Sequence, residues 1–273
     1  MSAVIRHVST ALPPRVALQE EAAALAPRFC GEHDKRQARM LRLLYRKSGV
    51  RKRHTVAVRG DHGPLEERIP YYPLAASAED LGPTTSARMG WYAEESPPLA
   101  HEAAGGALAG AGVTAKDITH LVTVSCTGFD APGVDAHLIE ELGLDRGVAR
   151  THVGFMGCHG ALNGLRAASA YVNADPDARV LLCAVELCSL HFAYGWDEEM
   201  LVANTLFADG AAALVLGGEG EGWRVAANGS YFMPDSQDAM TWTIGDHGFR
   251  MTLSARVPEL IETNLRAWLA EWL

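Results

Sequence analysis

The segment around Cys158 combines residue types that can carry covalent chemistry. Positions 153–161 read VGFMGCHGA, which places a thiol between glycines where an apolar strand pattern gives way to a small-residue helix pattern. Glycines allow the tight backbone of such a turn. A thiol at a helix start faces unpaired N–H groups and the positive end of the helix dipole, which can lower a cysteine pKa from ~8.5 to ~3.5–7.5. The pattern fits a nucleophile for acyl transfer, although spacing alone leaves a packing role for Cys158 open.

The remaining cysteines favour neither a metal site nor a disulfide framework. Five cysteines are an odd number, and no two are spaced as Cys-x-x-Cys. We therefore expect no metal. Cys183 and Cys188 fall in or just beyond an apolar run, where a thiol usually behaves as a small hydrophobe.

Positive charge is concentrated in one segment of an otherwise acidic chain. Residues 35–53 hold nine Lys or Arg residues and no acid, whereas the net charge of the chain is −9. The overall balance argues against a nucleic-acid surface. Arg39, Arg42 and Arg46 recur at helical spacing and can share one face of a helix.

The composition predicts a well-packed globule. Hydrophobic residues make up 48% and charged residues 21% of the 273 residues, and no apolar run is as long as a bilayer span requires. The amino terminus lacks the pattern of a secretory signal, so we expect a cytoplasmic protein without a membrane segment.

Apolar runs alternate with helical patterns along the chain, which predicts an α/β fold. Residues 54–75 look loop-rich, and the glycines of 217–222 mark a boundary. Helices are expected over 20–53, 86–111, 135–142, 161–173 and 257–273, and strands over 118–124, 148–155, 179–185, 211–216 and 223–232.

Several segments, in order along the chain, resemble the type III polyketide synthases of the chalcone and stilbene synthase kind. The nucleophile segment GCHGALNGLR at 157–166 is the first of them. The others are CTGFDAPG at 126–133, ARVLLCAVE at 178–186, FADGAAA at 207–213 and WTIGDHGF at 242–249, the last resembling bacterial members in particular.

The resemblance implies a thiolase-like fold and a homodimer. Residues 1–218 would form a complete N-terminal thiolase-like domain, and 219–273 would begin a C-terminal one. Family members load an acyl group from coenzyme A onto a cysteine and condense it with decarboxylated malonyl-CoA. Acyl-CoA and malonyl-CoA would thus be substrates, and no cofactor is expected.

Carried over by position, the resemblance assigns a role to each candidate residue. Cys158 would be the nucleophile, Phe207 the phenylalanine that gates the pocket, and Glu186 part of a polar network near the thiol. Cys126 and Thr127 would line the cavity. Apart from the resemblance, Phe207 reads as core, Glu186 as a paired carboxylate and Cys126 as an inert thiol.

The basic segment resembles the family region that meets the phosphates of coenzyme A. Guanidinium and ammonium groups suit charge-assisted contacts to phosphate. Met40 and Leu43 stand where the family often has cations, so the predicted contacts move to neighbouring positions. They are Lys47, Arg39, Arg42 and Arg46.

The resemblance places the family's catalytic histidine and asparagine beyond Leu273, so we expect a truncated chain with impaired condensation. Two further functions stay open. One is a ketoacyl synthase III-like condensing enzyme, which shares the fold and the nucleophile. The other is a non-catalytic remnant that binds acyl-CoA or a full-length homologue.

Overall fold

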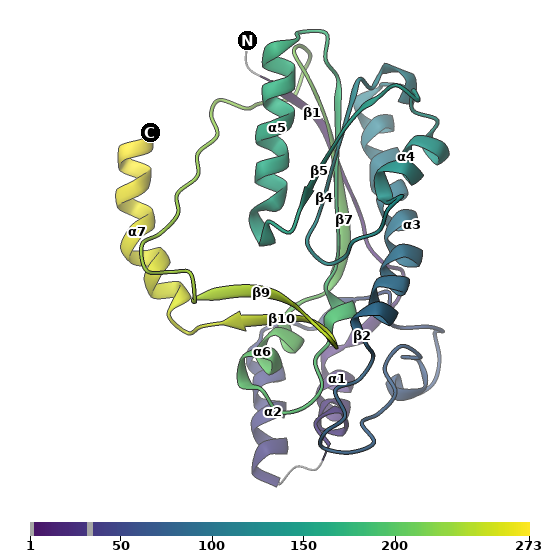
Figure 1. Cartoon of the computed structure of the whole chain (residues 1–273), viewed down its shortest axis with the longest axis vertical. Helices are drawn as coiled ribbons and strands as arrows, with labels where there is room; N and C mark the ends of the chain where they lie inside the picture. Colours follow the sequence, from purple (N-terminus) through teal and green to yellow (C-terminus); the bar gives the residue numbers. More distant parts are fainter. Residues whose placement is uncertain (1–2, 32–34) are drawn as a thin grey trace.

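A mixed sheet forms the centre of the upper lobe in the computed structural model, which describes residues 3–31 and 35–273 (Figure 1). Its strand order is β5-β4-β6-β7-β1-β8. Strand β4 pairs in parallel with β5 and β6, whereas β6, β7, β1 and β8 follow one another antiparallel. The strands are β1 (Val4–Ala11), β4 (His120–Ser125), β5 (Ala149–Gly154), β6 (Val180–Leu187), β7 (Asp209–Gly217) and β8 (Trp223–Arg224).

Helices cover both faces of this sheet (Figure 1). Helix α3 (Thr85–Ala111) packs on β1, β6 and β7, and α4 (Val134–Leu142) packs against α3. Helix α5 (Gly160–Ala174) lies on the opposite face, against β4 and β6. Small side chains on α3 allow a close approach, because its alanines 100, 103, 104 and 107 are fully buried in the core. The layers confirm the predicted α/β class.

A lower lobe lies at the end of the sheet where β4, β5 and β6 finish (Figure 1). It has its own apolar core, which includes Leu25, Phe29, Leu41 and Tyr45. Its elements are β2 (Val16–Leu18), α1 (Gln19–Leu25), η1 (Ala26–Phe29), α2 (Lys35–Lys47), β3 (Lys52–His54), η2 (Leu65–Glu67), η5 (Cys188–His191) and α6 (Glu198–Leu206).

The C-terminal part of the chain adds a hairpin and a helix. Strands β9 (Met240–Gly245) and β10 (Gly248–Leu253) pair antiparallel, and β10 contacts α6 and η5. Helix α7 (Val257–Trp272) follows and lies away from α3 and α4 (Figure 1). The short turns η3 (Ala115–Asp117) and η4 (Gly157–His159) complete the elements.

Most predicted elements between residues 85 and 217 are confirmed within a few positions, and α7 matches the predicted C-terminal helix. Two predictions are wrong. The predicted helix over 20–53 is divided into α1, η1, α2 and β3, and the predicted strand over 223–232 shrinks to β8. Within residues 3–31 and 35–273, no helix has the length and apolar character needed to cross a bilayer.

Candidate active site

Cys158 lies in the turn that joins β5 to α5. After Gly154 the backbone enters the left-handed region at Phe155 (φ 55°) and again at Gly157 (φ 65°). Glycine adopts this conformation readily, but a phenylalanine does so at a cost and only when its surroundings impose it. The ring of Phe155 packs 5.6 Å from Phe129 and 5.8 Å from Phe249. The turn therefore presents Cys158 two residues before the first residue of α5, Gly160.

Close packing of α5 on the sheet sets the position of this turn. A Cβ on Gly164 would lie 2.9 Å from a methyl of Val124 and 3.0 Å from one of Leu182, so only glycine permits the observed distance. The start of α5 is thereby brought to the carboxyl ends of β4, β5 and β6. This edge is where open α/β sheets commonly bind ligands.

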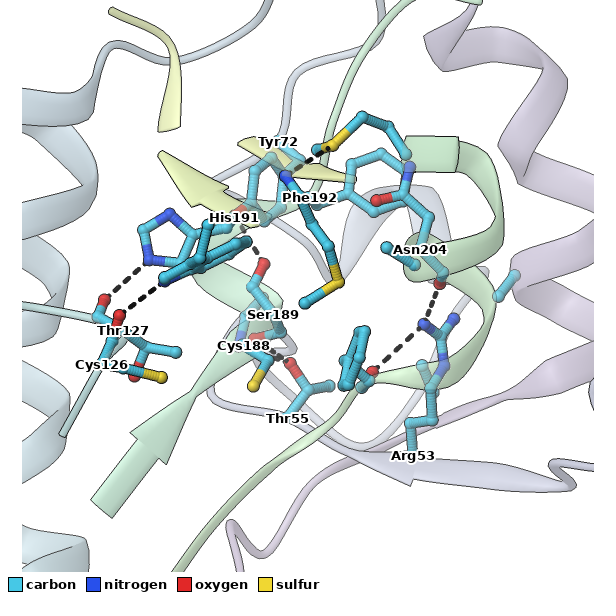
Figure 2. A pocket seen from close by; sticks show the side chains of 18 of the residues that line it. Arg53, Thr55, Tyr72, Cys126, Thr127, Cys188, Ser189, His191, Phe192 and Asn204 are labelled. Carbon is cyan, nitrogen blue, oxygen red and sulfur yellow. Dashed lines mark hydrogen bonds between the residues drawn. The ribbon is translucent and has the colours of Figure 1, made fainter. Parts of the chain in front are cut away.

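A cavity of about 540 Å³ opens at this edge and extends into the lower lobe. Its size is within the range of small-molecule sites. It brings together Cys158, Cys126, Thr127 and Phe207, four of the predicted site residues. Its wall also contains residues that were not singled out for function from the sequence, among them Arg53, Cys188 and His191 (Figure 2). Trp242 and the methionines 156, 200, 240 and 251 line it as well.

Three of the five cysteines face the cavity, in different surroundings. Cys158 is exposed, whereas Cys126 and Cys188 are partly buried. Burial, followed by the charge of Glu186, raises the pKa of Cys126 to about 12. Burial also raises the pKa of Cys188 well above its usual range. Cys126 and Cys188 are therefore neutral thiols at pH 7, and Cys158 is the accessible candidate for a nucleophile.

Glu186 lies behind the cavity wall and fixes the loop that follows β4. Its carboxylate accepts hydrogen bonds from the backbone N–H of Cys126 (2.9 and 3.1 Å) and from the hydroxyl of Thr127 (2.6 Å). The Ser125 hydroxyl is 3.4 Å away. Burial raises the pKa of Glu186, while these hydrogen bonds oppose the rise. Glu186 thus belongs to a polar network that holds the Cys126 loop, and it does not line the cavity.

His191 connects this loop to the hairpin (Figure 2). Its Nδ1 accepts from the backbone N–H of Phe249 (3.0 Å), so Nε2 must carry the proton that it donates to the Thr127 carbonyl (2.7 Å). The imidazole stacks on the Phe249 ring at 4.1 Å. Burial lowers the pKa of His191 to about 4. Trp242 Nε1 adds a donor to the Cys126 carbonyl at 2.7 Å.

Asp209 holds together the base of the site. Its buried carboxylate accepts from the backbone N–H of Val56 (2.8 Å) and of Ser189 (2.8 Å), and from the Ser189 hydroxyl (2.5 Å). Thr55 in turn donates its hydroxyl hydrogen to Ser189 Oγ at 2.8 Å (Figure 2). Burial raises the pKa of Asp209. Asp209, two residues after Phe207, thus joins β7, η5 and the chain after β3.

Arg53 hydrogen-bonds to the backbone at Phe207. Its Nη1 donates to the carbonyls of Asn204 and Phe207, which end helix α6 (Figure 2). A guanidinium at this end also complements the helix dipole. Its Cζ lies 5.7 Å from the ring centre of Tyr45. Phe207 is therefore held in the cavity wall by a cation that the sequence analysis had placed only in a general basic segment.

The four cations predicted to contact coenzyme A lie outside the cavity. Arg39, Arg42, Arg46 and Lys47 are exposed on α2 and none of them lines the cavity. Among the described residues, none of the four forms a salt bridge. No three His, Cys, Asp or Glu side chains gather as a metal site would require, within the part of the chain that the structure describes.

Comparison with known proteins gives a consistent result. The family model described as "Chalcone and stilbene synthases, N-terminal domain" matches residues 1–220. A 1,3,6,8-tetrahydroxynaphthalene synthase of Streptomyces peucetius subsp. caesius is 36% identical over 98% of this chain and 68% of its own length. An alpha-pyrone synthesis polyketide synthase-like protein, Pks18, of Mycobacterium tuberculosis is 32% identical over 99% of this chain and 67% of its own.

A solved structure extends the similarity to three dimensions. The crystal structure of 1,3,6,8-tetrahydroxynaphthalene synthase from Streptomyces coelicolor, a bacterial type III polyketide synthase, superposes with a TM-score of 0.82. It is 30% identical, and the match covers 97% of this chain and 71% of that one. The fold predicted from the sequence is therefore confirmed.

Proposed function

The chain belongs to the chalcone and stilbene synthase family of type III polyketide synthases, and from that premise we propose how its residues carry out acyl transfer. The observation that carries the proposal is Cys158, which is exposed in the turn before α5 and lines a cavity of about 540 Å³. An accessible thiol in the turn before a helix is an arrangement that covalent acyl transfer can use.

In the first half-reaction the Cys158 thiolate attacks the carbonyl carbon of an acyl-CoA. A new C–S bond forms to Cys158, and coenzyme A leaves as its thiolate. The neutral thiols of Cys126 and Cys188 stay outside this chemistry, because burial raises the pKa of both. The apolar wall, with Phe207 and four methionines, limits the access of water to the thioester.

In the second half-reaction malonyl-CoA loses CO₂, and the resulting carbanion attacks the Cys158 thioester. A carbon–carbon bond forms and the Cys158 thiolate is released. We assign Phe207 to the gate of the pocket. Cys126 and Thr127 shape the wall, and from behind them Glu186 accepts hydrogen bonds from the Cys126 backbone N–H and the Thr127 hydroxyl. The family resemblance supports these roles, together with the positions of Cys158, Phe207, Cys126 and Thr127 around one cavity.

The wider proposals follow from the same family. The exposed cations Arg39, Arg42, Arg46 and Lys47 would meet the phosphates of coenzyme A, which would be a substrate and not a resident cofactor. A homodimer, a cytoplasmic location and a second thiolase-like domain beginning at residue 219 are further proposals of this kind.

Intact-mass measurement tests the first half-reaction directly. After incubation with acetyl-CoA or a longer acyl-CoA, we expect one acyl adduct, mapped by peptide analysis to Cys158. Folded protein with no adduct from any acyl-CoA would contradict the proposal and favour a non-catalytic remnant. If an adduct forms, repeated extension with malonyl-CoA distinguishes a polyketide synthase from a ketoacyl synthase III-like enzyme, which extends once.

A further inference from the structure

Helix α6 ends at Phe207, the residue assigned to the gate of the pocket. The last carbonyls of a helix have no partner within it, so each needs a donor from elsewhere. Here the donors are side chains from distant segments. Arg53 Nη1 donates to the carbonyls of Asn204 and Phe207 (Figure 2). Gln19 Nε2 donates to the Thr205 carbonyl at 2.9 Å. The backbone that carries Phe207 is therefore fixed from outside its own helix.

The position of the Phe207 ring depends on this backbone more than on packing against other rings. Phe155, Phe192 and Phe249 each pack against further aromatic rings. Phe207 forms no such pair within the part of the chain that the structure describes. Its side chain is half-buried and lines the cavity. The direction of the ring thus follows from the end of α6 that Arg53 holds.

Arg53 differs from the other cations of its segment. Among the described residues that line the cavity, it is the only Lys or Arg. It forms no salt bridge with a carboxylate within residues 3–31 and 35–273. Its Nε is buried without a hydrogen-bond partner. Burying an unpaired donor is unfavourable, and a functional role is one reason for keeping such a group.

We propose that Arg53 is a positioning residue for acyl transfer, which holds the Phe207 ring in the cavity wall and so keeps water from the Cys158 thioester. This role rests on the proposed function and deepens it. Without the guanidinium, the end of α6 loses two hydrogen bonds and the ring can leave the wall. Water then attacks the thioester carbonyl, the C–S bond breaks, and the acyl group departs as a carboxylic acid while the Cys158 thiol is regenerated.

The lifetime of the acyl group on Cys158 tests this role. After removal of excess acetyl-CoA, mass spectrometry follows the loss of the adduct with time. We expect Arg53→Met to shorten the lifetime roughly tenfold, and Arg53→Lys, which keeps a donor and the charge, to shorten it less than about threefold. Arg146→Met is the control and should change nothing, because Arg146 is exposed and lies outside the cavity. Arg53→Gln takes the place of Arg53→Met if that variant does not fold.

A double-mutant cycle separates positioning of the ring from a general loosening of the lower lobe. Phe207→Ala alone should shorten the lifetime of the adduct. Adding Arg53→Met to it should change the lifetime less than about twofold, because the ring through which Arg53 acts has been removed. An equal effect of Arg53→Met in both backgrounds would overturn the proposal. So would a lifetime that Arg53→Met leaves unchanged in the original chain.

Fluorine NMR reports the surroundings of the ring without any reaction. In protein labelled with para-fluorophenylalanine, Phe207→Leu identifies the Phe207 signal by its loss. We expect Arg53→Met to shift or broaden this signal and Arg146→Met to leave it in place. An identical Phe207 signal in Arg53→Met and the original chain would overturn the proposal. If no acyl adduct forms in any variant, the proposed function fails, and the fluorine signal still decides whether Arg53 positions Phe207.

Discussion

Cys126 and Cys158 face one cavity from the ends of neighbouring parallel strands, but their loops are held in different ways. The loop of Cys126 is fixed by the Glu186 carboxylate, the Trp242 indole and the His191 imidazole, all from other elements. The loop of Cys158 is defined by its own left-handed turns and by the start of α5.

The difference teaches how one site can hold several thiols and use only one. Burial and a nearby carboxylate disfavour the anionic form of Cys126, so this thiol is a wall residue at neutral pH. Cys158 is exposed, whereas Cys126 is partly buried. Both cysteines follow the carboxyl end of a strand of the same sheet. They differ in solvent access and in the charge near the thiol, and these differences make Cys158 the nucleophile and Cys126 a wall residue.

The largest expected effect comes from replacing the Cys158 sulfur by oxygen, with the same exchange at Cys126 as the comparison. Cys158→Ser should reduce acyl transfer by roughly 10⁴-fold or more, because removing a catalytic nucleophile typically costs this much. Cys126→Ser should change it within about tenfold. Adduct formation followed by mass spectrometry provides the measurement. An adduct that persists in Cys158→Ser and disappears in Cys126→Ser would reverse the assignment.

Alkylation rates compare the two thiols without any substrate. With a pKa of about 12, only about one Cys126 in 10⁵ is a thiolate at pH 7. We expect iodoacetamide to modify Cys126 at least roughly 100-fold more slowly than Cys158, measured by peptide mass spectrometry. The rate at Cys126 should rise about tenfold per pH unit between pH 7 and 10. A rate at Cys126 that is independent of pH would contradict its assignment as a neutral thiol.

Acid should loosen the loop of Cys126 through His191. The folded pKa of about 4 lies below the usual 6.5, so the unfolded chain takes up the proton first as the pH falls. The stabilisation is complete above pH 6.5 and is lost between pH 6.5 and 4, a change of roughly 3 kcal/mol.

Urea unfolding at pH 7 and pH 4.5 measures this change. His191→Gln should flatten the pH dependence of the unfolding free energy relative to the original chain, because glutamine does not titrate. His62→Gln serves as the control, since His62 is exposed. A pH dependence that is the same in all three proteins would show that His191 is not the group responsible.

The smallest expected effect tests the influence of Glu186 on Cys126. Glu186→Gln removes the negative charge that raises the pKa of this thiol. We expect alkylation of Cys126 at pH 8 to become roughly threefold to tenfold faster. Glu141→Gln, on the exposed side of α4, should leave the rate unchanged. A slower rate in Glu186→Gln would mean that the carboxylate acts mainly as a hydrogen-bond acceptor that keeps the loop in place.

Local patterns predicted the elements around the nucleophile well. The turn at Cys158 and the strands around it depend on apolar runs and glycines that are close in sequence. The segment 20–53 was predicted less well, because apolar residues at helical spacing continue across a region that the structure divides into α1, η1, α2 and β3. Tertiary packing of the lower lobe overrides the local preference there.

By itself the sequence determined the α/β class, the family and the strand–turn–helix that carries Cys158, since each depends on residues near one another in the chain. Only the tertiary structure decided how Cys126 is surrounded. The hydrogen bonds from His191 to Thr127 and from Trp242 to Cys126 join positions 64 and 116 residues apart. The hollow in the lower lobe likewise appears only when separate elements pack, because a cavity is a property of the space between them and not of any one segment.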